Sequence, residues 1–273
     1  MGRSTGGCSW DLRETVGNVS RLAFKVWRRD LDVFLTLWKT NFLPPLLEPV
    51  FYVLAFGLGL GSLIGKLVYQ GVEVPYLEFM VPGVVSVAIM FWAFFETTYS
   101  SFVRMYYQKT FDAMIATPLL VEDVIAGELL WGLTKSLIAA GLMLLVMTAF
   151  GLVVWPSALL VIPLALVGGA LFASLGLITT AISPTIDSFN LPIFVVIFPM
   201  FMFSGTFFPV GILPPWASVV AWVLPLTHVS FLVRGAFLGW FPGGWIWSVL
   251  YLALVTPVAA GTALVLMKRR LIR

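Results

Sequence analysis

Apolar residues in this chain form long runs that short polar stretches interrupt. An α-helix needs about 20 apolar residues to cross the hydrocarbon part of a bilayer. Six runs reach that length, at residues 42–64, 81–103, 124–150, 157–182, 189–209 and 245–267. The pattern predicts an all-α integral membrane protein, with a six-helix membrane domain over residues 41–273 and a flexible arm over residues 1–19.

Residues 20–40 follow a different pattern, with apolar and charged side chains at helical spacing. One face of the predicted helix carries the apolar side chains Ala23, Trp27, Leu31, Phe34, Leu35 and Trp38. The charged side chains that tend to the other side are Arg21, Lys25, Arg28, Arg29, Asp32 and Lys39. This is typical of an amphipathic helix that lies on the inner membrane surface with its basic residues toward lipid headgroups. Packing of this helix against another protein is the alternative.

Composition agrees with a membrane protein and excludes several other classes. The chain is 60% hydrophobic and 11% charged, whereas soluble domains average about 45–50% apolar and about 25% charged residues. A net charge of +3 gives no reason to expect nucleic acid as a partner. Cys8 is the only cysteine and His228 the only histidine, so the sequence predicts no disulfide within the chain, no metal site and no cofactor.

The positions of Lys and Arg predict the orientation. Basic residues are frequent before residue 40 and again in the final KRRLIR, and cytoplasmic segments carry such residues. Both termini should therefore be cytoplasmic, which requires an even number of spans. Residues 189–233 contain no Asp, Glu, Lys or Arg, and Pro214, Pro215 and Pro225 interrupt the stretch. We therefore expect residues 210–240 to form a re-entrant hairpin on the outer side, with Arg234 near the interface.

A short polar segment, RMYYQKTFDAMIATPL at residues 104–119, separates the second and third spans. A helix over about 104–118 would end near Pro118 and suit docking in a groove of a partner. Its predicted apolar anchors are Met105, Phe111, Met114 and Ile115, and its charged residues are Arg104, Lys109 and Asp112. An ordinary solvated loop is the alternative.

Ionisable residues within the apolar runs are costly and mark candidate functional positions. Glu48 lies near the inner end of the first run, and Glu128 and Lys135 are seven residues apart in the third. Glu96 and Lys135 should lie at similar depth because their spans are antiparallel. We expect them to form an ion pair that fixes helix packing, and a proton or ion relay is the alternative.

Glycines in the first span recur at every fourth position, at Gly57, Gly61 and Gly65. Such a ridge lets a second helix approach closely, either within the chain or across a dimer. The stretch GLGLGSLIGKL is not a phosphate-binding loop, because Leu60 and Leu67 stand where glycine and Ser or Thr are required.

Two stretches resemble a known family. FETTYSSFVRMYYQKTFDAMIATPL (95–119) and FSGTFFPVGILPPWASVVAWVLPLTHVSFLVRG (203–235) are similar to permeases of type-2 ABC exporters. The similarity is greatest to the nodulation-factor branch, which exports lipo-chitooligosaccharides, and it extends to the polysaccharide and drug exporter permeases.

The resemblance implies a non-enzymatic transport subunit in the cytoplasmic membrane. Two permease subunits, expected to be a homodimer, would work with two copies of a separate ATPase that binds ATP and magnesium. Residues 104–118 would be the coupling helix that contacts this ATPase. The outer hairpin would be the exit gate, with Phe207, Phe208, Trp216, Trp222 and His228 lining it. An ordinary aromatic belt at the membrane interface is the alternative for the aromatic residues, and a packing or capping role is the alternative for His228. The substrate would be an amphiphile, such as a lipid-linked or lipo-oligosaccharide, a polysaccharide or a hydrophobic drug.

Two other classes compete with this interpretation. An ion-coupled secondary transporter would be expected to show internal repeats and acids at broken helices in mid-membrane, and only the fifth span, with Pro192 and Pro199, has a comparable feature. A membrane enzyme acting on lipid-linked substrates would need clustered His, Asp or Arg at an interface, which the sequence does not offer.

Overall fold

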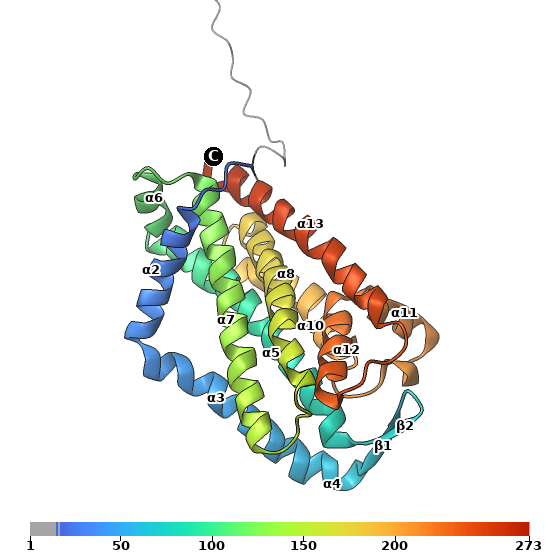
Figure 1. Ribbon diagram of the computed structural model, residues 1–273. Helices are drawn as coiled ribbons and strands as arrows, with labels where there is room; N and C mark the ends of the chain where they lie inside the picture. The colour runs from blue at the N-terminus through green and yellow to red at the C-terminus, as the bar shows by residue number, and fades with distance from the viewer. Residues whose placement is uncertain (1–14, 16, 273) are drawn as a thin grey trace, which may run out of the picture.

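The computed structural model describes residue 15 and residues 17–272, and within these it forms a bundle of long helices (Figure 1). The predicted arm over residues 1–19 therefore lies mostly outside the described residues. The α-helices are α2 (Ala23–Thr36), α3 (Trp38–Leu54), α4 (Gly61–Ile64), α5 (Tyr76–Phe95), α6 (Thr110–Ile115), α7 (Val121–Ala149), α8 (Val161–Ile182), α9 (Asn190–Pro192), α10 (Phe198–Phe203), α11 (Pro215–Val223), α12 (Pro225–Leu238) and α13 (Trp245–Ile272).

The six predicted spans are confirmed. Helices long and apolar enough to cross a membrane cover Trp38–Ile64, Tyr76–Tyr107, Val121–Ala149, Ser157–Ile182, Ile186–Phe203 and Trp245–Ile272. The second span is longer than expected because two π-helical stretches, Glu96–Ser100 and Val103–Tyr107, continue α5. The start of α2 and the end of α13 lie at the same end of the bundle (Figure 1), as six crossings require.

The second span is the centre of the bundle, and the first and fifth spans are its open side. Most of α5 is buried, and α5, α7 and α8 all contact one another. By contrast, only 11% of the apolar window of the first span and 17% of that of the fifth are buried. The apolar faces of these two spans are therefore left for lipid or for another protein.

Glycines bring the central helices unusually close together. A methyl group at Gly176 of α8 would lie 2.1 Å from Thr97 Oγ1, and one at Gly132 of α7 would lie 2.5 Å from Thr97 Cγ2. A methyl group at Gly169 would lie 2.0 Å from Ser136 Oγ. No side chain fits at these positions without moving its neighbours, so the glycines set the spacing between α5, α7 and α8.

The structure contains a short element that the sequence pattern did not predict. Strands β1 (Lys66–Tyr69) and β2 (Val72–Pro75) pair antiparallel, at the end of the bundle opposite to α6 and the end of α13 (Figure 1). Tyr69 packs edge-on against Phe79, with ring centroids 5.3 Å apart. Four-residue strands are too short to give a clear alternating pattern, which is why the hairpin was missed.

The segment between the fifth and sixth spans is bent. Helices α11 and α12 meet at an angle of 85°, and the intervening Leu224 is extended. Pro225 at the start of α12 cannot continue the hydrogen bonding of α11. Arg234 lies beside the β1–β2 hairpin, but α12 is largely buried and the Arg234 side chain is enclosed in the bundle rather than exposed.

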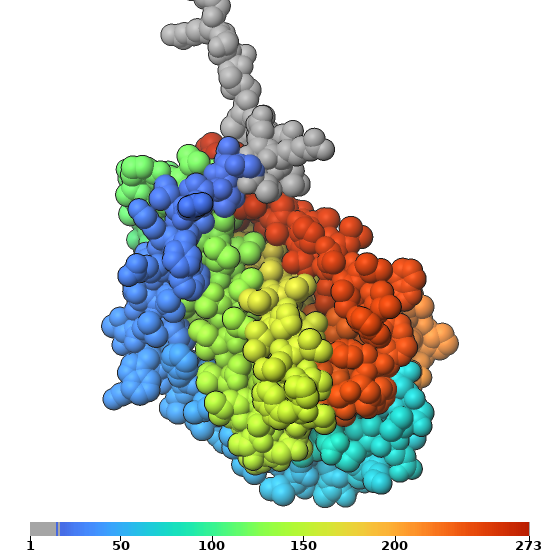
Figure 2. All heavy atoms as spheres, viewed as in Figure 1, coloured from blue at the N-terminus to red at the C-terminus, as the bar shows by residue number. Residues whose placement is uncertain are grey.

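Helix α2 packs along α7 rather than standing apart from the bundle (Figures 1 and 2). Its buried residues are Ala23, Val26, Asp30 and Phe34. The Trp27 indole donates a 2.8 Å hydrogen bond to Thr134 Oγ1. The buried face differs from the predicted apolar face, since Leu35 and Trp38 are exposed and Asp30 is covered.

Candidate functional site

A buried charge cluster joins the second and third spans near the end of the bundle that carries α6. The Arg104 guanidinium donates to Glu128 through Nε, with Nε–Oε1 3.0 Å, and through Nη2. Its Nη1 lies 2.9 Å from Glu96 Oε1. Glu128 is fully buried and also accepts a hydrogen bond from Ser101. One planar cation therefore binds two carboxylates on different helices, the geometry for which arginine is suited.

Glu96 and Lys135 lie together, at the positions expected from their depth. Lys135 Nζ is 3.5 Å from Glu96 Oε2, and the Trp131 indole donates to Glu96 Oε1 at 2.9 Å. The Lys135 ammonium also lies 4.7 Å from the centroid of the Phe34 ring on α2. Glu96 thus accepts contacts from Arg104, Lys135 and Trp131, and the cluster connects the second span, the third span and α2.

A third carboxylate near the charge cluster comes from α2, where the Asp30 side chain lies beside Arg104 and Glu96. Its side chain is 3% exposed and bonds Arg29 at 3.0 Å, while its Oδ2 has no hydrogen-bond partner among the described residues. Burial and, after it, the charges of Glu128 and Glu96 raise the pKa of Asp30 to about 7 against the opposing charges of Arg104 and Arg29. Asp30 can therefore change its charge near neutral pH.

Beside the charge cluster, residues 106–112 expose a polar and aromatic surface. Tyr106 and Tyr107 are 53% and 62% exposed, and Gln108, Lys109 and Asp112 are exposed beside them. We call these five residues the 106–112 face. It lies at the same end of the bundle as the end of α13 (Figure 1).

The apolar residues of this segment turn inward. Phe111, Met114 and Met105 belong to a buried cluster with Val124 and Ile125 of α7, and Ile115 packs at its edge. The core of the described chain therefore covers Met105, Phe111 and Met114, and the partner contact expected of this segment stays a prediction. Arg104, also assigned to the partner contact, is instead occupied by Glu96 and Glu128. Lys109 and Asp112 remain exposed and available.

A row of half-buried aromatic rings runs along the open side of the bundle. Consecutive ring centroids are 5.3–6.0 Å apart. In order, the rings are Tyr99, Phe95, Phe91, Phe201, Phe207, Phe56 and Tyr52. A cavity of about 430 Å³, which Glu48 and Glu96 also line, lies at the Tyr99 end. The aromatic row thus begins beside the charge cluster.

The five residues expected to form an exit gate do not form one group. Phe207 belongs to the aromatic row, and Phe208 is half-buried. Trp216 is 66% exposed and contacts Phe203 edge-on. His228 is buried, with hydrogen bonds to Ser248 and to the carbonyl of Trp222 and its ring stacked on Tyr251.

The expected glycine ridge is shorter in the structure than in the sequence. A methyl group at Gly57 would lie 3.4 Å from Leu77, whereas one at Gly61 would meet only the Phe56 carbonyl. Gly65 lies beyond α4 with φ +67°, where glycine ends the helix. The ridge therefore does not extend to Gly65.

Sequence reasoning missed the central role of Arg104 in the charge cluster. Arg104 follows Glu96 by eight residues on one continuous span, which places both side chains within reach along the helix. A span that ended at residue 103 put Arg104 in the polar segment instead. Asp30 was missed because it stands on a helix whose partner the sequence did not identify.

Comparison with known proteins places these features in a family. A model of the family described as ABC-2 type transporter matches residues 22–238. Nodulation protein J of Sinorhizobium fredii is 36% identical over 219 residues, covering 80% of this chain and 82% of that protein. Nodulation protein J of Rhizobium leguminosarum bv. viciae is 35% identical over 250 residues, covering 91% and 94%. Inner membrane transport permease YadH of Escherichia coli is 25% identical over 215 residues, covering 78% and 82%.

Proposed function

The chain belongs to the ABC-2 type transporter family, and from this membership we propose that it is the permease subunit of an ATP-driven exporter. In this proposal two copies of the chain form the path across the cytoplasmic membrane. Two copies of a separate ATPase bind at the end of the bundle where α2 begins and α13 ends, which we take as cytoplasmic, and supply ATP and magnesium. The chain itself catalyses no reaction.

The observation that carries the proposal is the position of the 106–112 face. Tyr107, Lys109 and Asp112 are exposed at the end of the same span that holds Arg104 and Glu96. Exposed tyrosines beside charges are typical of residues that anchor a protein interface. A movement of a bound ATPase would reach the charge cluster directly, because Arg104 is only two residues from Tyr106 and links the second and third spans.

The aromatic row supports an amphiphilic substrate. Rings spaced at 5.3–6.0 Å offer apolar faces on which sugar rings and acyl chains both pack. The row lies on the first, second and fifth spans, with Phe207 in the segment just after the fifth, and the first and fifth are the least covered spans. If a second copy of the chain packs there, the row becomes the wall of a path between the subunits.

The first experiment tests the ATPase contact. The chain and its candidate ATPase are purified together in lipid discs, as wild type, as Tyr107→Asp/Asp112→Lys, and as Val72→Asp. Val72 is also exposed but lies on β2 at the opposite end. We expect the double variant to lose at least about tenfold in ATPase association, as hot-spot substitutions do, while Val72→Asp associates normally. Equal association of all three proteins would refute the assignment of the 106–112 face.

A second experiment tests the substrate class and the driving force. ATP hydrolysis by the complex is measured with an alkyl oligosaccharide and with the matching alkyl chain lacking sugar. Stimulation by the first, reduced in Phe95→Ala and retained in Trp247→Ala, is the expected result, since Trp247 is exposed and outside the aromatic row. Transport by the purified chain alone under a proton gradient would support the ion-coupled alternative instead.

A further inference from the structure

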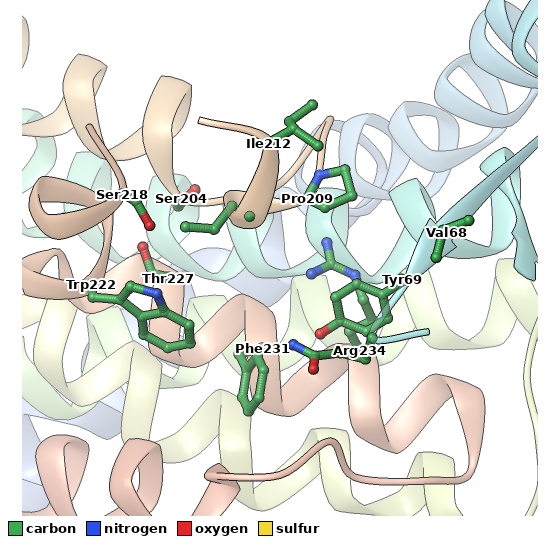
Figure 3. Close-up of a pocket in the computed structure, with 13 residues that line it drawn as sticks. Val68, Tyr69, Ser204, Pro209, Ile212, Ser218, Trp222, Thr227, Phe231 and Arg234 are labelled. Atoms are coloured by element: carbon green, nitrogen blue, oxygen red, sulfur yellow. The ribbon is translucent and has the colours of Figure 1, made fainter. Parts of the chain in front are cut away.

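A second cavity lies beside the β1–β2 hairpin, which is at the end of the bundle opposite to α6 (Figure 1), and Figure 3 shows residues that line it. It has a volume of about 440 Å³ and opens between the β1–β2 hairpin, the loop after α10, and helices α11 and α12. We call it the hairpin cavity. The residues that matter for its chemistry are Tyr69, Gln70, Ser204, Trp222, Phe231 and Arg234.

Arg234 forms the floor of the hairpin cavity and is 3% exposed. Its Nε donates to the Phe79 carbonyl at 3.0 Å, and its Nη2 donates to the Gly205 carbonyl at 2.7 Å. The guanidinium carbon lies 3.9 Å from the centroid of the Phe79 ring and 5.3 Å from that of Tyr69. In the described part of the chain, no carboxylate lies within 4.0 Å of this guanidinium.

This environment compensates the charge of Arg234 only in part. Backbone carbonyls and aromatic faces carry partial charges, and they hold a guanidinium in place without neutralising it. A buried cation is normally paired with an anion because removing it from water is expensive. The hairpin cavity therefore contains a positive charge whose counter-ion the described residues do not supply.

Tyr69 adds an unused donor to the same wall. Its side chain is 5% exposed, and its hydroxyl makes no hydrogen bond of normal geometry with the described residues. Burial raises the pKa of Tyr69, although the charge of Arg234 opposes this, so the phenol is neutral at physiological pH and can donate. The Tyr69 ring lies next to the Arg234 side chain at the cavity (Figure 3).

We propose that the hairpin cavity binds a phosphate group carried by a lipid or another amphiphile. The phosphate would accept hydrogen bonds from Arg234 and Tyr69 and supply the missing negative charge, and the Gln70 amide lies at the same wall to donate as well. Trp222 and Phe231 give an apolar side against which the remainder of the amphiphile packs. Phosphate binding at the hairpin cavity needs no ATPase and does not depend on the export proposal.

The test compares two lipids that differ only in the phosphate. The purified full-length chain is incubated in detergent with dioleoyl phosphatidic acid or with dioleoylglycerol, and bound lipid is counted by native mass spectrometry. The chain should retain phosphatidic acid at least about tenfold better than dioleoylglycerol, as expected for charge-assisted hydrogen bonds. Inorganic phosphate is then added as competitor. Displacement means that the phosphate group alone is recognised, and no displacement means that the site needs a lipid-borne phosphate; both results support the site.

Matched variants locate the binding. Gln70→Glu puts a carboxylate at the cavity wall and should reduce phosphatidic acid retention about tenfold. Val72→Glu adds the same charge to the same hairpin but lines a different cavity, and should change retention less than about twofold. Tyr69→Phe removes one hydroxyl and keeps the ring, so it tests the site even if Gln70→Glu fails to fold. Equal retention of both lipids, or a preference that neither Gln70→Glu nor Tyr69→Phe reduces, would overturn the proposal.

Discussion

Arg104 and Arg234 lie at opposite ends of this bundle, the first mostly covered and the second buried, and their surroundings differ. Arg104 binds Glu96 and Glu128 on two helices. Arg234 binds two backbone carbonyls and stacks near two rings, with no carboxylate of the described chain in contact. The first arginine has its charge neutralised by this chain, whereas the second keeps its charge available. A buried ionisable residue can thus either hold helices together or mark a binding site. The presence or absence of an oppositely charged partner in the chain distinguishes the two cases.

The largest expected effect follows from removing the neutralised arginine. Arg104→Leu leaves Glu128 fully buried without its cation, which should lower stability by about 3–5 kcal/mol. The measurement is the thermal midpoint of the purified protein in detergent. The double variant Arg104→Leu/Glu128→Gln removes the stranded charge and should recover part of the loss. A single variant as stable as the wild type would show that the charge cluster does not hold these spans together.

The charge cluster should also respond to pH, because it includes Asp30. A carboxyl group whose pKa rises from 3.8 to about 7 on folding binds more protons in the folded state between these values. Its contribution to stability is therefore complete below about pH 4 and is lost as the pH rises to about 7. The loss is at most about 4 kcal/mol, since one pKa unit corresponds to about 1.4 kcal/mol.

Comparison of Asp30→Asn with the wild type isolates this effect. The variant should lose less stability than the wild type when thermal midpoints are measured from pH 5 to pH 8. Tyr69→Phe, at the hairpin cavity, should leave this pH dependence as it is. Parallel pH profiles for Asp30→Asn and the wild type would mean that Asp30 does not titrate in this range.

Removing the other arginine should have a smaller effect on stability. Arg234→Gln strands no carboxylate of the described chain and loses hydrogen bonds to the carbonyls of Phe79 and Gly205. We expect a loss of about 1–3 kcal/mol, together with loss of phosphatidic acid retention. If Arg234→Gln were as destabilising as Arg104→Leu, the distinction between the two arginines would fail.

The smallest effect is expected at Lys135. Its ammonium is 3.5 Å from Glu96, which keeps Arg104 as a closer partner. Lys135→Met should lower stability by about 1 kcal/mol, because the aliphatic stem and the ring contacts are largely replaced. Glu96→Gln distinguishes the packing role of the Glu96–Lys135 pair from a proton or ion relay. If this variant still assembles but no longer transports substrate, the relay is favoured.

The sequence was sufficient for features that local pattern determines and insufficient for those that depend on pairing. Apolar runs identify the spans because each spanning helix must present apolar side chains to the hydrocarbon of the bilayer along its own length. The proximity of Glu96 and Lys135 could be inferred from depth alone. Arg104 was misplaced because the π-helical stretches extend the second span beyond its apolar run.

The amphipathic segments show the same limit. The apolar sides of residues 104–118 and of α2 were recognised, but a pattern does not say what covers them. Phe111 and Met114 are buried by α7 of the same chain, and α2 buries Asp30 together with Val26. The hairpin cavity could not be foreseen at all, since Tyr69 and Arg234 are brought together from distant parts of the sequence.

The glycine contacts between the central helices have a mechanical consequence. Gly132 and Gly176 lock α7 and α8 against Thr97, and a methyl group at Gly83 would lie 2.7 Å from the Thr206 carbonyl in the loop before α11. Surfaces in such close contact cannot slide past each other by small steps. We therefore expect α5, α7 and α8 to move together as one rigid body. If these helices move as one body, a displacement of the end that carries α6 also displaces the contact between Gly83 and the loop before α11.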